Sequence, residues 1–142
     1  MREIKFRAWD KKLKRMGRVL FLMFSDNGEK VVQYYWENKN SFRVSYTSDF
    51  ELMQFTGLKD KNGKDIYEGD IVAWENTVRG FPAPGPDAIP VKPMVISWSE
   101  RFASFVLDRD GWASSHWFGE SCESKECEVI GNIYENPDLV KP

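Results

Sequence analysis

The residues best suited to metal chemistry lie near the C-terminal end, where His116, Cys122 and Cys127 are spaced as H-x5-C-x4-C. Imidazole and thiolate groups are common zinc ligands, and Glu120 or Glu126 would be available as a fourth. The spacing lacks the C-x-x-C pair that is typical of structural zinc sites. We therefore predict no metal site and no other cofactor.

Acid–base or nucleophilic catalysis has two candidate locations in the sequence. The first location is near His116, where a nearby cysteine could act as a nucleophile with His116 as its base. A pocket that brings His116 next to Asp108 or Asp110 could serve as an active site in the same region. Glu68 and Asp70 could act as acid and base if both lay on one strand face. Because no acid, base and nucleophile converge in sequence, we predict that the protein is not an enzyme. A site near His116 is kept as an alternative.

The segment 56–72, TGLKDKNGKDIYEGDIV, is crowded with turn residues. The KNGK sequence lacks the glycine spacing of a Walker phosphate loop, so a tight hairpin or loop is the preferred interpretation. In EGDIV, glycine allows unusual backbone geometry, and aspartate can accept hydrogen bonds from nearby backbone N–H groups. We expect Asp70 to be tied to the backbone at a strand entrance and Ile71 to be buried. The residues predicted to shape these turns are Asn62, Gly63, Gly69 and Asp70.

The N-terminal end is strongly basic, and its cations alternate with an aromatic residue. Exposed aromatic side chains among cations suit single-stranded nucleic acid, where bases stack and phosphates pair. The residues of this candidate face are Lys5, Arg7, Trp9, Lys11 and Lys12. In the alternative interpretation, Trp9 packs on a neighbouring strand or subunit beneath the aliphatic stems of Lys5 and Arg7. The basic end would then neutralise the acidic segment 108–138, within or between subunits.

Composition points to a single β-rich domain. The chain has 142 residues, a net charge of -2 and an aromatic content of 15%, with 6 Trp. Aromatic side chains favour strands and contact surfaces. No apolar run approaches the ~20 residues of a membrane span, and MREIKFRAWD lacks the apolar core of a signal peptide. We therefore expect a cytoplasmic protein with reduced cysteines and no membrane partner.

The hydrophobic pattern predicts strands separated by frequent turns. The segment 17–24 is expected to be buried on both faces, and 48–55 forms either a short strand or one helical turn. The proline-rich segment 79–93 is predicted to be a long loop, because proline cannot join a sheet interior. The other predicted strands are 4–9, 29–36, 42–46, 70–78, the hairpin 95–108, and 127–134.

Three segments, MREIKFRAWD, TGLKDKNGKDIYEGDIV and VIGNIYENPDL, occur in this order from the first residue nearly to the last. Together they resemble the YopX family, which comprises small proteins of phages and of prophages in Gram-positive bacteria. The resemblance implies a β-rich fold, a phage or prophage origin and a cytoplasmic location in the bacterial host. It implies no activity and assigns no catalytic or binding residues.

Taken together, these observations predict an all-β, YopX-like domain that spans residues 1–142. A small SH3-like barrel would occupy about residues 52–134, with the N-terminal strands packed on it. We predict a non-enzymatic binding or assembly protein, because aromatic residues are abundant and the two ends carry opposite charge. Its partner would be a second copy of the chain, or a phage or host protein. Nucleic-acid binding through the basic N-terminal face is the first alternative, and an enzyme is the second.

Overall fold

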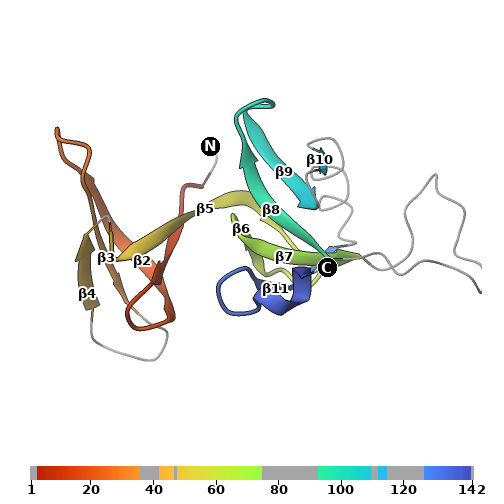
Figure 1. Ribbon diagram of the computed structural model, residues 1–142, viewed down its shortest axis with the longest axis horizontal. Coiled ribbons are helices and arrows are strands. Elements are labelled where there is room, and N and C mark those ends of the chain that lie inside the picture. Colours follow the sequence, from red (N-terminus) through yellow and green to blue (C-terminus); the bar gives the residue numbers. More distant parts are fainter. Residues whose placement is uncertain are drawn as a thin grey trace, which may run out of the picture. The chain divides into compact units, whose positions relative to one another are not determined.

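The computed structural model describes residues 3–35, 42–46, 48–74, 93–109, 112–114 and 127–141. Strands dominate these residues and form two sheets with antiparallel pairings (Figure 1). The all-β prediction is therefore confirmed. The chain divides into two compact units, Met1–Phe55 and Thr56–Pro142.

The first unit is built on antiparallel strands of a six-stranded sheet in the order β4-β3-β2-β1-β5-β6. The strands β1 to β4 follow one another in chain order, whereas β5 returns to pair with the free edge of β1. The turn between β2 and β3 has the sequence SDNG, which is typical of a hairpin. Its Gly28 takes a φ of 83°, and the Gly28 amide donates to Ser25 O at 2.9 Å. Glycine suits this position because a side chain disfavours positive φ. The strands are β1 (Phe6–Asp10), β2 (Arg15–Phe24), β3 (Lys30–Tyr35), β4 (Phe42–Tyr46) and β5 (Phe50–Lys59).

The strand β5 settles the ambiguous segment 48–55. It is extended from Phe50 to Lys59, and its first half pairs with β1 in the register Phe6↔Gln54 to Asp10↔Phe50. The strand form of that prediction is therefore right, and the helical turn is wrong. The second half of β5 lies beside β6 (Asp65–Tyr67), which completes the six-stranded sheet.

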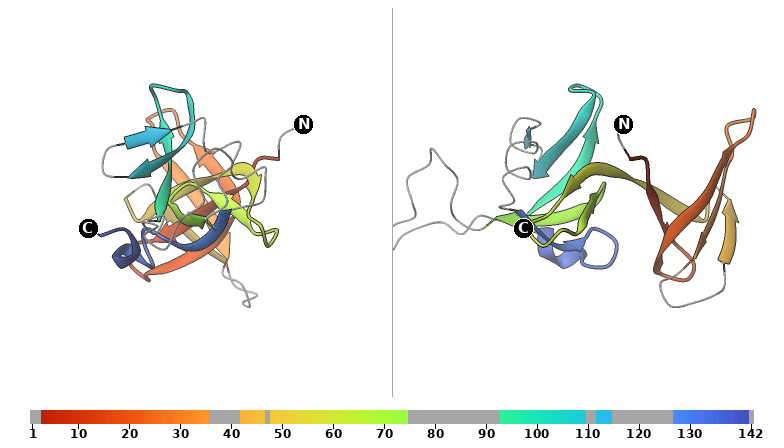
Figure 2. Two further views of the ribbon diagram at one scale, coloured as in Figure 1. Left: turned by 90° about the vertical axis from the view of Figure 1, so that its right-hand side faces the viewer. Right: turned by 180° about the vertical axis from the view of Figure 1, so that it is seen from behind.

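The second unit contains a five-stranded sheet in the order β10-β9-β8-β7-β11. The predicted hairpin of 95–108 is present as β8 and β9, joined by a turn at residues 100–103 (Figures 1 and 2). A short 3-10 helix, η1 (Pro137–Val140), follows the sheet. The strands are β7 (Asp70–Trp74), β8 (Met94–Ser99), β9 (Ser104–Arg109), β10 (Trp112–Ser114) and β11 (Cys127–Asn132).

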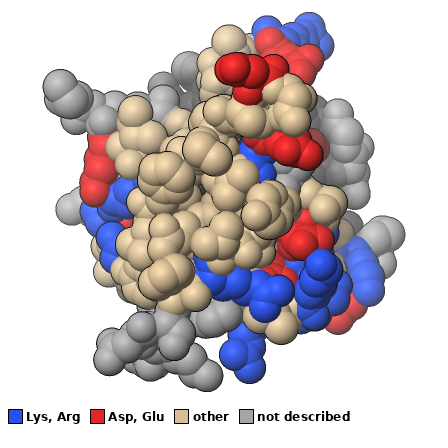
Figure 3. All heavy atoms as spheres, turned by 90° about the vertical axis from the view of Figure 1, so that its left-hand side faces the viewer, with Lys and Arg blue, Asp and Glu red and all other residues tan. Residues whose placement is uncertain are grey.

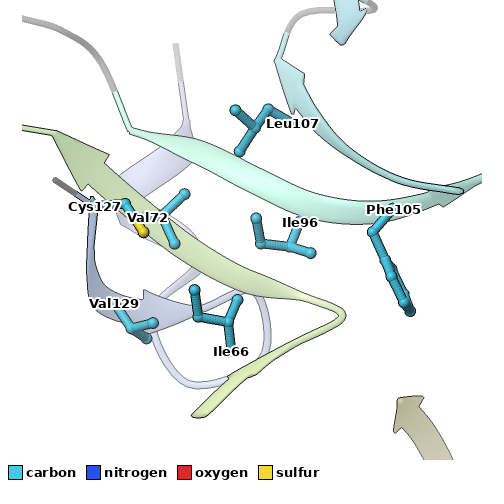
Figure 4. Packing of buried hydrophobic residues seen from close by; sticks show 7 residues of the cluster. All are labelled: Ile66, Val72, Ile96, Phe105, Leu107, Cys127 and Val129. Atoms are coloured by element: carbon cyan, nitrogen blue, oxygen red, sulfur yellow. The ribbon is translucent and has the colours of Figure 1, made fainter. Parts of the chain in front are cut away.

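The core of the second unit draws on most of its strands. Its buried side chains, shown in Figure 4, are Ile66, Val72, Ile96, Phe105, Leu107, Cys127 and Val129. Ile66 belongs to β6 and Val129 to β11, so the core brings together segments that are more than sixty residues apart in the chain. Burial of these apolar side chains is the main stabilising contribution available to the unit.

Neither sheet closes among the described residues, because neither strand order returns to its first strand. The prediction of an SH3-like barrel is therefore not confirmed. Most of the proline-rich loop at 79–93 and most of the segment 110–126 lie outside the described residues. Within the described ranges, no helix has the length and apolar character that crossing a membrane requires.

Candidate interaction face

The strand β2 contains a bulge that decides which of its side chains are exposed. Its pairing with β3 shifts between Val19 and Phe21, so Leu20 is an extra residue. A bulge of one residue reverses the alternation of side chains beyond it. Val19 and Leu22 therefore pack on the same core, while Leu20 is 59% exposed. The prediction that 17–24 is buried on both faces is wrong for this reason.

The opposite side of β2, β3 and β4 carries three cross-strand rows, which we call the outer face. Each row joins directly opposed residues, which lie on the same side of a sheet. Five of its apolar side chains, from β2 and β4, are between 46% and 62% exposed. The rows are Arg18–Tyr35–Phe42, Phe21–Gln33–Val44 and Met23–Val31–Tyr46.

The outer face carries almost no charge. Arg18 is its single ionisable basic side chain, and no acid occurs among its nine positions. Figure 3, seen from the side on which β2, β3 and β4 lie in Figure 1, shows a broad uncharged area with charged residues of both signs along its margin. Contiguous exposed apolar surface of this kind marks interaction sites in soluble proteins.

A buried polar cluster lies on the inner side of the same sheet, which holds the core of the first unit. The Tyr34 hydroxyl donates to Asp10 Oδ2 and lies 3.4 Å from Ser45 Oγ. The other carboxylate oxygen of Asp10 accepts from Lys12 N and Leu13 N at 2.8 and 2.7 Å. Arg43 Nε lies 3.3 Å from Asp10 Oδ2, as an ion pair without hydrogen-bond geometry.

This cluster shifts the pKa of the Asp10 carboxyl and that of the Tyr34 hydroxyl. Burial alone would raise the pKa of Asp10, but hydrogen bonds from Tyr34, Leu13 and Lys12 outweigh it, and the pKa lies below its ordinary value. Burial, followed by the bond to Asp10, raises the pKa of Tyr34 to about 12. Asp10 therefore stays ionised and Tyr34 stays protonated at neutral pH. The arrangement holds the turn after β1 in place.

The predicted nucleic-acid residues of β1 are mostly covered. Trp9 is only 7% exposed, so its ring cannot stack on bases. Arg7 Nε donates to Met53 Sδ at 3.4 Å. Lys5 lies 4.5 Å above the Phe55 ring and forms an ion pair with Glu3 at 3.1 Å.

The two lysines that follow β1 are also paired. Lys11 Nζ lies 2.7 Å from Glu51, and Lys12 Nζ lies 2.9 Å from Asp49. Both partners belong to the first unit and not to the acidic segment 108–138. The basic N-terminal end is thus neutralised in part by acids near the start of β5.

The predicted turn residues lie in two turns of the second unit. Gly63 has a φ of 80° and Gly69 a φ of 77°, both in the left-handed region that glycine favours. Asp70 Oδ2 accepts from Tyr67 N at 2.8 Å, and Ile71 is fully buried. Asn62 N donates to Asp60 Oδ1 at 2.9 Å.

Asp60 organises the first of these turns, although the sequence analysis did not single it out. It is 2% exposed, and its Oδ1 also accepts from Lys64 N at 2.9 Å. Its Oδ2 accepts from Val129 N of β11 at 3.0 Å. Burial would raise the pKa of Asp60, but the hydrogen bonds from Val129, Lys64 and Asn62 outweigh it and lower the pKa.

The candidate catalytic groups do not form a site among the described residues. Asp70 is 1% exposed and bound to backbone, whereas Glu68 precedes the strand in the turn. Cys127 is buried in the core of the second unit. No cluster of metal-ligating side chains occurs in the ranges that the structure describes. Asp108 lies in β9. The remaining members of these sets lie outside the described residues, and they are His116, Cys122, Glu120, Glu126 and Asp110.

The comparison with protein families matches residues 5–141 to the YopX protein model. This chain belongs to the YopX family. Protein EF1440 from Enterococcus faecalis, a crystal structure, is 27% identical, and 99% of this chain matches 100% of that chain with a TM-score of 0.66. Protein yopX from Bacillus subtilis is 20% identical over 99% and 100% of the two chains, with a TM-score of 0.55. No curated protein matches the chain.

The first two segments that resemble YopX proteins supply the buried aspartates Asp10, Asp60 and Asp70. Asp10 ends the first segment, and Asp60 and Asp70 lie in the second. The third segment supplies Val129, which binds Asp60, and Ile133, whose amide donates to Gly69 O at 2.9 Å. In this YopX family member, the recognisable segments therefore serve the architecture, and the outer face lies between the first two of them.

Proposed function

We propose that this YopX family member is a non-enzymatic binding or assembly protein whose interaction surface is the outer face of β2, β3 and β4. The observation that carries the proposal is the set of exposed apolar side chains in three aligned rows. The proposal includes the phage or prophage origin and the cytoplasmic location implied by the family resemblance.

The size of this surface supports a binding role. Phe21, Phe42 and Tyr46 are each more than half exposed. At about 200 Å² per aromatic side chain, these three alone leave on the order of 300 Å² uncovered. Patches of that size are the largest found on typical monomers and are often functional. Covering the face with a partner would remove apolar area from water at about 25 cal/mol per Å².

Nucleic-acid binding through β1 receives less support. Single-stranded nucleic acid needs exposed rings and a track of cations for its phosphates. Trp9 is covered, and Lys11 and Lys12 each have a carboxylate within 3 Å. These features favour a protein partner over a polyanion.

A test compares the wild-type chain with Val44→Glu, which places a charge in the middle row. Light scattering at low and high salt measures self-assembly, and capture from host lysate with and without nuclease measures binding to other molecules. Phe102→Ser, which alters an exposed aromatic residue in the β8–β9 turn, is the matched control.

Under the proposal, Val44→Glu abolishes self-assembly or capture, while Phe102→Ser and nuclease leave it unchanged. Circular dichroism and the unfolding midpoint establish that both variants are folded. A monomer that captures nothing, or whose interactions survive Val44→Glu, would contradict the proposed function.

A further inference from the structure

The edge strands of the two sheets differ in how well they are protected from pairing with another chain. A strand at the edge of a sheet presents a row of N–H and C=O groups that a further strand can bind. Proteins shield such edges with bulges, lysine or proline residues, short length or a covering loop. Among the described residues, the edges are β4 and β6 of the six-stranded sheet and β10 and β11 of the five-stranded sheet.

Three of these edges are shielded. The strands β6 and β10 are each three residues long. The pairing of β11 with β7 has a bulge between Val129 and Gly131. The turn between β5 and β6 also covers part of β11, since Lys61 N donates to Cys127 O at 2.9 Å and Asp60 Oδ2 accepts from Val129 N at 3.0 Å.

The strand β4, with the sequence FRVSY, lacks these protections. It is five residues long, contains no proline or lysine, and pairs with β3 without a bulge. Tyr46 O accepts from Asp49 N at 2.8 Å, but a carbonyl oxygen has a second lone pair. Its one charged residue, Arg43, points to the inner side, where it lies 3.3 Å from Asp10 Oδ2. An inward-pointing charge restricts which strand can pair with an edge, because like charges directly opposed repel.

The sequence of β4 is complementary to itself. Opposed residues of two paired strands lie on the same side of the sheet, so outer residues must oppose outer residues. An antiparallel pairing of two copies centred on Val44 meets this condition along the whole strand. It places Phe42 opposite Tyr46 of the second copy, and Arg43 opposite Ser45 of the second copy. Aromatic side chains then meet in pairs, and a hydroxyl group faces the arginine.

Other registers of the same strand are poorer. A pairing centred on Arg43 sets two arginines directly against each other. A pairing centred on Ser45 joins only the last three residues of the strand. An extended segment of another protein can bind any exposed edge, but only a second copy brings this complementary sequence with it.

We propose that two copies of this chain associate through antiparallel pairing of their β4 edges about Val44. The interface is isologous, because the same strand is used on both copies. Main-chain hydrogen bonds supply the affinity, as in other cases of strand addition. The inference goes beyond the proposed function, since the edge joins the copies while the apolar rows of both outer faces remain exposed as one continuous surface.

The first experiment places cysteines in the full-length chain and links them by mild oxidation. In Val44→Cys the two introduced thiols are directly opposed, at a separation that a disulfide can bridge. Phe42→Cys or Tyr46→Cys alone should stay unlinked, because the two thiols are then about 14 Å apart along the strands. A mixture of these two variants should form linked dimers. Wild type, with its two native cysteines, and Phe21→Cys on β2 are the controls. Mass spectrometry identifies the joined peptides.

The second experiment measures association by light scattering over a range of protein concentrations. Val44→Glu and Val44→Lys should each raise the dissociation constant about tenfold or more, because each sets like charges against each other. An equal mixture of the two should restore the dimer. Phe21→Glu is the matched control, since it adds the same charge to the outer face away from the edge and should leave association unchanged. Circular dichroism establishes that all variants are folded.

Other outcomes separate this inference from the proposed function. A chain that stays monomeric and unlinked overturns the edge pairing, and so does association that Phe21→Glu abolishes or that links Phe21→Cys as readily as Val44→Cys. If Phe21→Glu then also abolishes capture from lysate, the proposed function stands without the edge. Linked β4 edges together with capture that Phe21→Glu leaves unchanged would support the edge pairing and contradict the proposed function.

Discussion

Asp60 Oδ2 accepts a hydrogen bond of 3.0 Å from the backbone amide of Val129, which lies 69 residues further along the chain. The other oxygen accepts from Asn62 N and Lys64 N, both at 2.9 Å. A single buried carboxylate thus closes the turn between β5 and β6 and fastens it to β11. Asp10, the last residue of β1, closes the turn that follows this strand in a similar way. Its Oδ1 accepts hydrogen bonds from Lys12 N and Leu13 N.

Replacing Asp60 by asparagine is expected to lower the free energy of unfolding by about 3 kcal/mol. The substitution removes the charge and turns one acceptor into a donor that faces a backbone N–H, and hydrogen bonds to charged groups contribute about 1.5–3 kcal/mol each. Urea denaturation measures the effect. The matched control is Asp138→Asn, whose side chain is highly exposed and pairs with Lys141. The control should change stability by less than about 0.5 kcal/mol. Equal effects would mean that Asp60 is not structural.

Stability should fall in acid because the pKa values of Asp10 and Asp60 are lowered in the folded state. A depressed folded pKa contributes stability that is fully present above the unfolded value of about 3.9. That contribution is lost as pH falls from there through the folded pKa, where both carboxylates take up protons. Urea midpoints from about pH 6 down to about pH 2 measure this, and Asp60→Asn should show a shallower decline than wild type. Parallel curves would contradict the assignment.

The sequence predicted most strands of the fold because their signals are local. Alternation of apolar and polar residues identifies β1 and β4, and the SDNG turn identifies the hairpin between β2 and β3. The exposure of β2 was not predictable in this way. Arg18 is followed by six apolar residues, so nothing in the sequence marks Leu20 as the bulged residue. The pairing of β2 with β3 determines which residue is bulged, and therefore which side chains of β2 are exposed.

The candidate site was predicted only in part, for a related reason. Alternation placed Arg7 and Trp9 on one side of a strand, but it could not show that Trp9 is covered. The aspartate of LKDKNG is a usual turn residue, yet its bond to Val129 depends on which strand lies alongside the turn. The apolar rows of the outer face depend on how β2, β3 and β4 pair with one another. No single segment of the sequence determines that pairing register.

Replacing Tyr34 by phenylalanine is expected to cost about 2 kcal/mol, because the buried carboxylate of Asp10 loses a donor. The cost should vanish in alkali. Burial and the bond to Asp10 raise the pKa of Tyr34 to about 12. A raised folded pKa contributes stability that is complete below the unfolded value of about 10 and is lost as pH rises toward the folded value. The difference in unfolding free energy between wild type and Tyr34→Phe, measured across this range, should shrink. A constant difference would refute the coupling.

Replacing Gly17 by alanine should disturb the same cluster from the neighbouring strand. An added Cβ would lie 2.3 Å from Tyr34 Cδ2 and 3.1 Å from Cγ, and the ring is held by its hydroxyl on Asp10. Overpacking of this kind costs about 2 kcal/mol. Thermal and urea unfolding of Gly17→Ala measure the loss.

A double-mutant cycle separates the clash from any effect of alanine on the strand itself. In a Tyr34→Leu background the obstructing ring is absent, and alanine in place of glycine reduces the entropy of the unfolded chain. Gly17→Ala should then be neutral or stabilising by a few tenths of a kcal/mol, which gives a coupling energy of about 2 kcal/mol with Tyr34. An equal loss in both backgrounds would show that the Tyr34 ring does not require glycine at position 17.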